Sequence, residues 1–430
     1  MSKLQVAVIG AGAAGLVTAR ELQRQGHQAT VLEQSARVGG VWVYSPQTET
    51  DPLGQSGARI HGSLYASLRT NLPRDLMAFV DYPFDSSGGG ADDWPRFPGH
   101  AQVLAYLERF ARDFGLLQCI RFDTSVAAVR PGGPEGGWLV EATTAGESWR
   151  QRFDAVAVCN GHYSEPRVPE IPGLAEFPGQ LLHSHNYREP SPFAGKRVAL
   201  LGASASALDL SAEIAGVAEA VYCCAEAFSA LPEGARVTGK LQRLPGIETL
   251  GADGSIRLQD GQSLEPVDAL MFCTGYRYAY PFFDDGLVRV ADNWVSPLYQ
   301  DLLHIDRPSL AFIGIPFRVV PFPLFELQAQ WFARLLAGRF ALPSPADMRV
   351  HTAARIAALR AAGVKQRHFH QRSLDCYDYL DALAEQSGAA PPPAWQRQLI
   401  AALLAHIAAN LGVYRDRPFP AYAPTRIPQP

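Results

Sequence analysis

Residues 4–9 form a short apolar run, rich in β-branched side chains, that ends on Gly10. This pattern predicts a buried strand. A helix from residue 13 to about residue 25 is predicted to follow, and then a second strand over 29–32 that ends on Glu33. The order strand, helix, strand predicts a βαβ unit with parallel strands, and therefore an α/β fold.

The same pattern returns further along the chain. Residues 197–202 restart an apolar strand, 205–215 are predicted to be helical, and 221–224 form the next strand. Other apolar runs predict strands at 153–159, 268–273 and 310–314. Two shorter segments, 126–129 and 138–142, predict a β-hairpin laid over the sheet.

Apolar residues at helical spacing predict an amphipathic helix at 100–114. The C-terminal part is predicted to be largely helical, at 325–336, 346–362, 374–385 and 395–411. The first of these helices is predicted to start just after Pro321 and Pro323, which suit a first turn. Four prolines between residues 166 and 178 mark a linker.

Gly10, Gly12 and Gly15 fall in GxGxxG spacing at the turn into the first helix. In a dinucleotide-binding unit these glycines allow a tight turn, a close approach to a pyrophosphate, and packing of helix on strand. The pyrophosphate would sit at the helix N-terminus beside Ala14, and Glu33 would accept hydrogen bonds from a ribose. The motif alone is weak, and a glycine-tolerant turn without a ligand is the alternative; the flanking strands and acidic residue favour the dinucleotide.

Two further turns extend this prediction. Gly39 and Gly40, followed by Trp42, would let the backbone crowd the same ligand. The second βαβ unit has a GxSxSA turn, in which small residues replace two of the three glycines. We expect Gly202, Ser204 and Ser206 of this turn at the cofactor. Because it follows a linker in a chain with one such unit already, we interpret it as a second nucleotide site.

The net charge and composition argue against several classes of function. The net charge is −4 and no basic block occurs, which argues against nucleic acid as a partner. The chain leads directly into its first strand without a signal peptide, and the apolar segment 399–411 is too short to span a bilayer. We therefore expect a cytoplasmic protein without membrane contact. No CxxC pair or spaced ligand set predicts a metal site or a redox dithiol.

Residues 177–187 match the FxGxxxHxxxY fingerprint of flavin-containing monooxygenases. The segments 39–42, 69–73, 272–276, 312–316 and 321–323 are similar to the same family. The sequences of these segments are most similar to those of the soluble branch of the family, which includes the plant S-oxygenating enzymes. The resemblance is good from residue 4 to about 345 and looser to about 415.

The resemblance implies two dinucleotide-binding, Rossmann-like domains in an α/β fold. The nicotinamide domain would be inserted in the FAD domain, and the chain would end in a helical tail. The first part of the FAD domain would span residues 1–165, the NAD(P)H domain 166–280, and the second part of the FAD domain with the tail 281–430.

The implied activity is an FAD-dependent monooxygenase of the N,N-dimethylaniline type. NADPH or NADH reduces FAD, the reduced flavin adds O2 at its 4a carbon, and the hydroperoxide passes one oxygen to an amine nitrogen or a thioether sulfur. The protein positions the rings and excludes water. The sequence leaves open which small molecule is oxygenated and whether the protein is a monomer or a homodimer.

By matching position, Asn71 is the expected catalytic residue beside the flavin and the nicotinamide. A carboxamide can donate and accept hydrogen bonds without taking up charge; the plainer alternative is an Asn that caps a turn. His183 is expected to be a structural imidazole at the hinge between the domains rather than an acid–base group. Further residues expected at the cofactors are Leu72, Thr274, Gly275, Gln328 and Tyr187; for Gln328 a solvated helix position is the alternative.

One position departs from the family. After the second unit's strand the family usually places an Arg that grips the 2′-phosphate of NADPH, whereas this chain has Glu226. A carboxylate should repel that phosphate and could bond a free 2′-hydroxyl. We expect weakened NADPH preference and usable NADH, unless Arg236, Lys240 or Arg243 holds the phosphate.

Three rivals remain at this point. A Baeyer–Villiger monooxygenase uses the same cofactors on ketones, but a tryptophan usually replaces the final tyrosine of its fingerprint, here Tyr187. A flavin-dependent disulfide reductase is disfavoured because no CxxC occurs. The third rival is a flavoprotein without turnover that serves as a binding partner.

Overall fold

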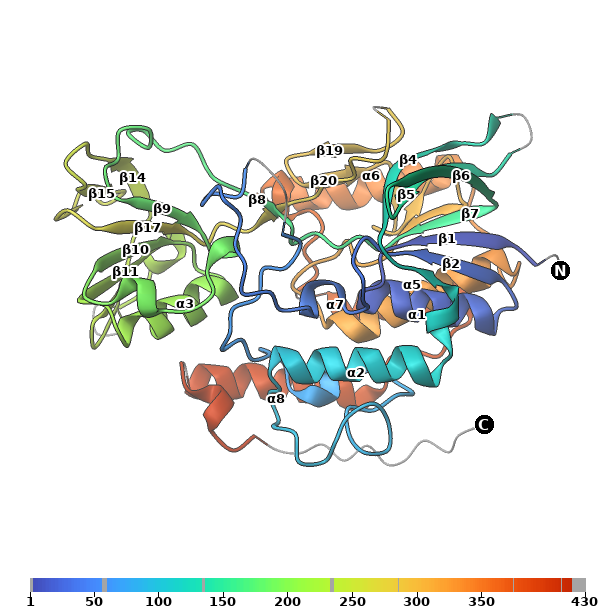
Figure 1. Cartoon of the computed structure of the whole chain (residues 1–430), viewed down its shortest axis with the longest axis horizontal. Helices are drawn as coiled ribbons and strands as arrows, with labels where there is room; N and C mark the ends of the chain where they lie inside the picture. The colour runs from blue at the N-terminus through green and yellow to red at the C-terminus, as the bar shows by residue number, and fades with distance from the viewer. Residues whose placement is uncertain are drawn as a thin grey trace.

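The computed structural model describes residues 3–55, 60–133, 136–232, 236–284, 286–373, 375–410 and 412–419. Its two large sheets stand on opposite sides of the molecule (Figure 1). One has the strand order β21-β22-β23-β7-β1-β2-β3 and the other β12-β13-β11-β10-β17-β9. The prediction of an α/β fold with two Rossmann-like units is confirmed.

The first sheet is built around β1, which pairs in parallel with β2 and β7. Its strands are β1 (Gln5–Ile9), β2 (Gln28–Leu32), β3 (Ile120–Arg121), β7 (Ala155–Val158), β21 (Leu298–Tyr299), β22 (Leu303–His304) and β23 (Leu310–Phe312). The central strands are apolar and buried on both faces, as a parallel sheet covered by helices requires. The strand predicted at 153–159 is shorter, because Phe153 belongs to the preceding strand.

Helices α1 (Ala13–Arg24) and α5 (Pro321–Leu336) pack together on one face of this sheet (Figure 1). Helix α5 begins at Pro321, four residues before the predicted start. Prolines are tolerated there because first-turn N–H groups have no acceptor within the helix.

The second sheet is built in the same way around β10, which pairs in parallel with β11 and β17. Helix α3 (Ala205–Ala215) has the predicted bounds. The strands are β9 (Gln180–His183), β10 (Arg197–Leu201), β11 (Ala220–Cys224), β12 (Val237–Thr238), β13 (Leu241–Leu244) and β17 (Ala269–Phe272). We retain 166–280 as the proposed bounds of this domain.

The chain passes between the two units through a short antiparallel pair, β8 (Glu165–Pro166) with β18 (Tyr276–Arg277). The strands of the second sheet thus lie, in sequence, between strands of the first. Small antiparallel additions complete the β structure: β14 (Ile247–Leu250), β15 (Ile256–Leu258), β16 (Ser263–Leu264), β19 (Arg289–Ala291) and β20 (Trp294–Ser296).

The predicted two-stranded hairpin over the first sheet is a three-stranded meander. It consists of β4 (Thr124–Pro131), β5 (Trp138–Thr144) and β6 (Glu147–Phe153). Trp138 and Val140 face the apolar side of the first sheet. Strand β6 was missed because its residues are mostly polar and solvent-facing, so no apolar alternation marks it.

The remaining helices are α2 (His100–Asp113), α6 (Pro345–Ala361), α7 (Cys376–Ser387) and α8 (Ala394–Ala409). They confirm the predicted helical C-terminal part; Leu374 and Leu411, at ends of predicted helices, lie outside the described residues. None of the helices in the described part of the chain has the length and apolar character needed to cross a membrane.

A buried arginine joins α1 to α5. The Arg20 guanidinium is 2% exposed and bonds Glu21 at 2.9 Å, Glu326 at 2.6 Å and Asp81 at 2.8 Å. It also lies 4.9 Å from the ring centroid of Phe110. Removing one partner of such a cluster leaves uncompensated charge in the core, which is costly.

We predict that Arg20→Met lowers the free energy of unfolding by about 3–5 kcal/mol, because Glu326 and Glu21 lose their buried partner. The matched control is Arg24→Met: Arg24 is 41% exposed and bonds Asp81 at 2.7 Å and Glu21 at 3.1 Å, but both carboxylates keep Arg20, so only about 1 kcal/mol is expected. Urea unfolding measures both, and equal losses in the two variants would contradict the assignment.

Candidate active site

Both Rossmann units turn from strand to helix where one backbone segment crosses another. A Cβ on Gly10, whose φ is 103°, would lie 2.6 Å from the carbonyl oxygen of Cys159. A Cβ on Gly202, at φ 147°, would lie 2.4 Å from the corresponding oxygen of Cys273. Neither distance is compatible with a side chain, so both turns require glycine.

The first turn leaves donors and space for a pyrophosphate. Gly12 is the N-cap of α1 and provides no side-chain cap, so first-turn N–H groups around Ala14 remain for a ligand. A Cβ on Gly15 would lie 1.8 Å from the Gly10 oxygen, so helix and strand are in the closest contact there. The turn fits a dinucleotide phosphate.

The second glycine pair, Gly39 and Gly40, lies against the first turn. A Cβ on Gly40 would lie 3.0 Å from the Gly12 Cα, and the Gly39 N–H donates to the Ala11 carbonyl at 3.0 Å. Trp42 is half-buried in the short 3-10 helix that begins at Gly40. These backbones would both border the same ligand.

Glu33 directly follows β2 beside the first turn. Its Oε2 accepts from the Ala11 N–H at 2.6 Å, and its Oε1 accepts from the Ser35 N–H and the Ser35 hydroxyl, both at 2.8 Å. A carboxylate has about four acceptor sites, so a ribose hydroxyl can still be accepted. The ribose contact itself stays a prediction.

The turn into α3 is equally open. Ser204 is the N-cap without a side-chain cap bond, and Ser204 and Ser206 are exposed. First-turn N–H groups are again available to a pyrophosphate. The chain therefore carries two cradles whose backbone geometry fits two dinucleotides.

One large cavity, of about 900 Å³, joins the two units. Asn71 and Leu72 line it from the first unit, and Ser204 lines it from the second unit. Helix α8, drawn in red below α3 in Figure 1, contributes another part of the wall, as do residues 318–320, Ser373, Cys376 and Tyr377. We call this cavity the cleft.

Asn71 is exposed in the cleft, whereas its neighbours are held in place. The Thr70 N–H donates to the Pro98 carbonyl at 2.9 Å, and the Thr70 hydroxyl donates to the Leu72 carbonyl at 2.7 Å. Within the described residues the Asn71 side chain forms no hydrogen bond, so it does not cap a turn. Its carboxamide is available to a ligand.

His183 is a neutral, buried imidazole. Its Nδ1 accepts from the His185 N–H at 3.1 Å, so Nε2 carries the proton and donates to the Gly275 carbonyl at 3.1 Å. Burial, reinforced by His185, lowers the pKa of His183 to about 3. It ties β9 to the returning connection, where the Thr274 hydroxyl donates to the Arg167 carbonyl. This geometry fits the structural role rather than acid–base catalysis.

Two predicted cofactor residues lie inside the protein. The Tyr187 hydroxyl donates to Glu213 at 2.9 Å, and the side chain is 1% exposed, so it reaches the cleft only through Glu213. Gln328 is fully buried; its Oε1 accepts from the Gly314 N–H at 2.8 Å and its Nε2 donates to the Tyr379 hydroxyl at 2.7 Å. The solvated alternative for Gln328 is wrong, and a contact with the isoalloxazine stays a prediction.

Glu226 follows β11 at the start of a 3-10 helix and is exposed. Its Oε2 lies 3.4 Å from Lys365 Nζ. The side chains of Arg236 and Lys240 donate hydrogen bonds to nearby backbone carbonyls, those of Leu231 and Ala218. Arg243 lies in register beside Cys223 and lines the cleft, so it is the predicted phosphate ligand best placed near the end of β11.

Comparison with known proteins agrees with this geometry. The flavin-binding monooxygenase-like family model matches residues 3–231 and 229–401. The chain is 44% identical over 96% of its length to a flavin-containing monooxygenase GS-OX-like protein of Arabidopsis thaliana, of which 93% is covered. The chain belongs to the flavin-binding monooxygenase-like family.

Solved structures of this family show how far the likeness extends. An S-allyl-L-cysteine S-oxygenase from Allium sativum superposes with a TM-score of 0.90 at 42% identity, covering 97% of this chain and 95% of that one. A protein from Pelagibacter, at 23% identity and a TM-score of 0.80, shows the fold alone. The whole monooxygenase architecture is therefore present.

Sequence reasoning missed the residues that close the cleft of this monooxygenase. Arg415 donates from both Nη atoms to Asp209 of α3, at 2.9 and 2.8 Å, and from Nε to the Thr70 carbonyl at 3.0 Å. Asp209 also accepts from the Tyr65 hydroxyl at 3.0 Å. One guanidinium thus joins α3 of the second unit to the residue before Asn71. No local pattern marks Arg415, because its partners lie far away in the sequence.

Arg69 secures the same C-terminal segment. Its Nη1 pairs with Asp416 at 2.5 Å and its Nη2 donates to the Arg415 carbonyl at 2.9 Å. The segment 414–416, which follows α8, is therefore fixed across the cleft by two arginines. We call this arrangement the C-terminal clamp.

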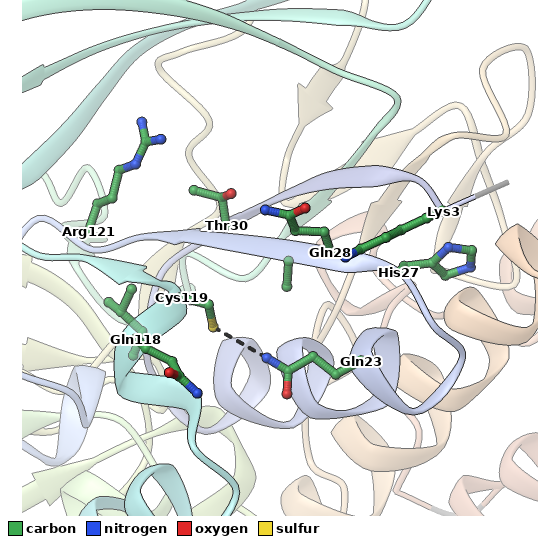
Figure 2. A pocket seen from close by; sticks show the side chains of 10 residues that line it. Lys3, Gln23, His27, Gln28, Thr30, Gln118, Cys119 and Arg121 are labelled. Atoms are coloured by element: carbon green, nitrogen blue, oxygen red, sulfur yellow. Dashed lines mark hydrogen bonds between the residues drawn. The ribbon is translucent and has the colours of Figure 1, made fainter.

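A second cavity, of about 420 Å³, lies at the edge of the first sheet, away from both glycine turns. Figure 2 shows Gln23 directed toward Cys119, which it contacts at 3.8 Å, with His27 and Arg121 at the rim. Burial raises the pKa of the Cys119 thiol, which leaves it a poor nucleophile. This cavity has no part in the monooxygenase site.

We predict that Arg415→Ala raises the KM for NAD(P)H roughly 10-fold, because the bidentate bond to α3 and the bond to the Thr70 carbonyl are both lost. A larger share of the consumed NAD(P)H should end as hydrogen peroxide instead of oxygenated product. The matched control is Arg417→Ala, an exposed arginine two residues away. Peroxide release equal to that of the control would contradict the role of the clamp.

Proposed function

We propose that this protein is an FAD-dependent, NAD(P)H-consuming monooxygenase that transfers one oxygen atom of O2 to the sulfur of a small thioether. The second oxygen atom leaves as water. Amine nitrogen is the second candidate acceptor. The observation that carries the proposal is the single cleft onto which the free carboxamide of Asn71 and the open N-terminus of α3 both face.

Each cradle suits one cofactor. The turn at Gly10, the Gly39–Gly40 pair and Glu33 would hold FAD, and the turn at Gly202 would hold the nicotinamide dinucleotide. When bound, the flavin supplies the activation of O2 that protein side chains alone lack. The protein itself contributes the binding and positioning of the cofactors and the exclusion of water.

The chain's own residues supply that positioning. Asn71 offers one donor and one acceptor at the cleft surface and takes up no proton there. His183 and Tyr187 hold the domain connection and α3 in place behind the cleft. The C-terminal clamp covers the cleft from the side of α8, which limits the access of water.

Sulfur is preferred over nitrogen because the Allium relative, an S-oxygenase of S-allyl-L-cysteine, is 42% identical over nearly the whole chain. The alternative of a Baeyer–Villiger enzyme has less support. Cyclohexanone monooxygenase shares 16% identity, a level at which only the fold is comparable, and Tyr187 stands where those enzymes usually have tryptophan.

The third alternative, a flavoprotein without turnover, lacks support from the site. A flavoprotein kept only as a binding partner would still need the turn at Gly10 to hold FAD, but it needs neither a second such turn at Gly202 nor a free Asn71 carboxamide in the cleft. These features are the ones that a turnover enzyme requires.

We predict that the FAD-loaded protein oxidises NAD(P)H faster when a thioether is added, and that isotopically labelled O2 places one labelled atom in the sulfoxide. A panel of thioethers, tertiary amines and ketones, read by mass spectrometry, ranks the acceptors. Exclusive conversion of ketones to esters would instead establish the Baeyer–Villiger alternative. NAD(P)H consumption that ends entirely as peroxide for every compound would contradict the proposal.

We also predict that NADH supports turnover with a kcat/KM within about 10-fold of that for NADPH, because Glu226 repels a 2′-phosphate and accepts from a 2′-hydroxyl. Glu226→Arg should shift the ratio toward NADPH by roughly 10-fold or more. Glu219→Arg, which makes the same charge change before β11, is the control. Strong NADPH preference in the unmodified protein would show the inference from Glu226 to be wrong.

A further inference from the structure

Arg318 lines the cleft immediately before helix α5, together with Val319 and Val320. The side chain is exposed. Within the described residues it forms one hydrogen bond, a long one of 3.4 Å from Nη1 to Oε1 of the uncharged Gln371. The guanidinium therefore presents most of its five donors to the cleft.

The backbone at Arg318 is held in an uncommon conformation. Its φ is 53°, in the left-handed region that side chains other than those of Gly, Asn and Asp seldom adopt. Glycine would suit this position without strain. Strained backbone of this kind concentrates at ligand sites, and here it places an arginine at the cleft wall beside the start of α5.

Three of the other four cleft arginines are paired with carboxylates, and the fourth, Arg243 on β13, donates to the Thr238 hydroxyl at 3.2 Å. Arg69 pairs with Asp416, Arg415 with Asp209, and Arg397 with Asp378 and Asp381. The third cleft carboxylate, Glu213, accepts from the Ser67 hydroxyl at 2.8 Å and from Tyr187. Arg318 has no such carboxylate partner among the described residues.

The surroundings of Arg318 add further positive charge. Burial lowers the pKa of His368, and the neighbouring cations Arg367, Arg318, Arg167 and Lys365 lower it further. The His368 ring lies 6.2 Å from the ring of Phe317, the neighbour of Arg318, so these cations lie near that end of the cleft, although Lys365 also pairs with Glu226. Their positive potential attracts an anion and disfavours a protonated amine.

The rest of the cleft is suited to an aliphatic group. Apolar side chains line it from four segments of the chain: Leu72, Leu208, Val319, Val320, Ile400 and Leu404. A small molecule with an alkyl or alkenyl portion and one anionic end would match both parts.

We propose that Arg318 binds the anionic group of the substrate, and that the preferred substrates are thioethers that carry a carboxylate or a comparable anion. This deepens the proposed function and rests on it. Arg318 is then a specificity-determining residue: its guanidinium can hold a carboxylate by two parallel hydrogen bonds and so set the distance from the anion to the sulfur.

The experiment compares (methylthio)acetate with its methyl ester, two thioethers that differ in charge at one end. The FAD-loaded variants are Arg318→Asn, which removes the charge but tolerates the left-handed backbone, and Arg318→Lys, which keeps the charge without the fork. Arg397→Ala removes an arginine of the same cleft that two aspartates already neutralise.

We expect Arg318→Asn to lower kcat/KM for the carboxylate roughly 10- to 100-fold, through KM, and to change that for the ester by less than about 2-fold. Arg318→Lys should recover part of the loss. Arg397→Ala should change the carboxylate-to-ester ratio much less than Arg318→Asn does.

An equal fall for both thioethers, or no fall, would overturn the proposal. A rise in the KM for NADPH but not for NADH would assign Arg318 to the cofactor phosphate and overturn it too. If the unmodified protein oxygenates neither thioether, the proposed function fails. The anion site is then decided by calorimetric binding of pentanoate, which does not react, to the holoenzyme and to Arg318→Asn: equal affinity would overturn it.

Discussion

The close crossing of backbone over backbone at two glycines is the constraint on which this structure depends. At Gly10 and at Gly202 the chain passes so near the carbonyl of a cysteine on the adjacent strand that no Cβ fits. Each crossing lets a helix begin directly at the end of a buried strand, with its first-turn N–H groups unpaired. Two anion-binding helix ends result from the same local solution, used twice in one chain.

Two dinucleotide-binding turns can serve a monooxygenase only if the two ligands that they hold come into contact. The connections between the two units determine whether they do. The β8–β18 pair carries the chain between the units, the His183 N–H donates to the Pro52 carbonyl at 3.0 Å, and the Tyr65 hydroxyl donates to Asp209 of α3 at 3.0 Å. These contacts fix the second unit against the first. Arg415 adds a bond across the cleft from the far end of the chain. The cleft is therefore formed by elements distant in sequence, and its water-excluding wall belongs partly to the C-terminal segment.

The sequence predicted what local patterns encode. Buried parallel strands appear in the sequence as apolar runs. The GxGxxG and GxSxSA patterns located both strand-to-helix turns, because Gly10 and Gly202 meet a steric requirement of the backbone there. Helix α3 has the predicted bounds because the GxSxSA turn marks where it begins. The start of α5 was placed four residues late because prolines resemble a helix boundary, although a first turn accepts them.

What escaped prediction depends on contacts between distant residues. Strand β6 has a polar, exposed sequence and becomes a strand only by pairing with β5. Arg415 and Arg318 look like surface arginines until the fold brings α8 and the segment before α5 to the cleft. The burial of Gln328 likewise follows from Tyr379 on another helix, which no periodicity in α5 reveals.

The most direct test of the account is anaerobic mixing of the FAD-loaded protein with NADH or NADPH, followed by absorbance of the flavin. If the two cradles hold their ligands in hydride-transfer contact across the cleft, the bound flavin should be reduced rapidly and in full, far faster than free FAD under the same conditions. Bound flavin that stays oxidised with both nicotinamides would contradict the central claim.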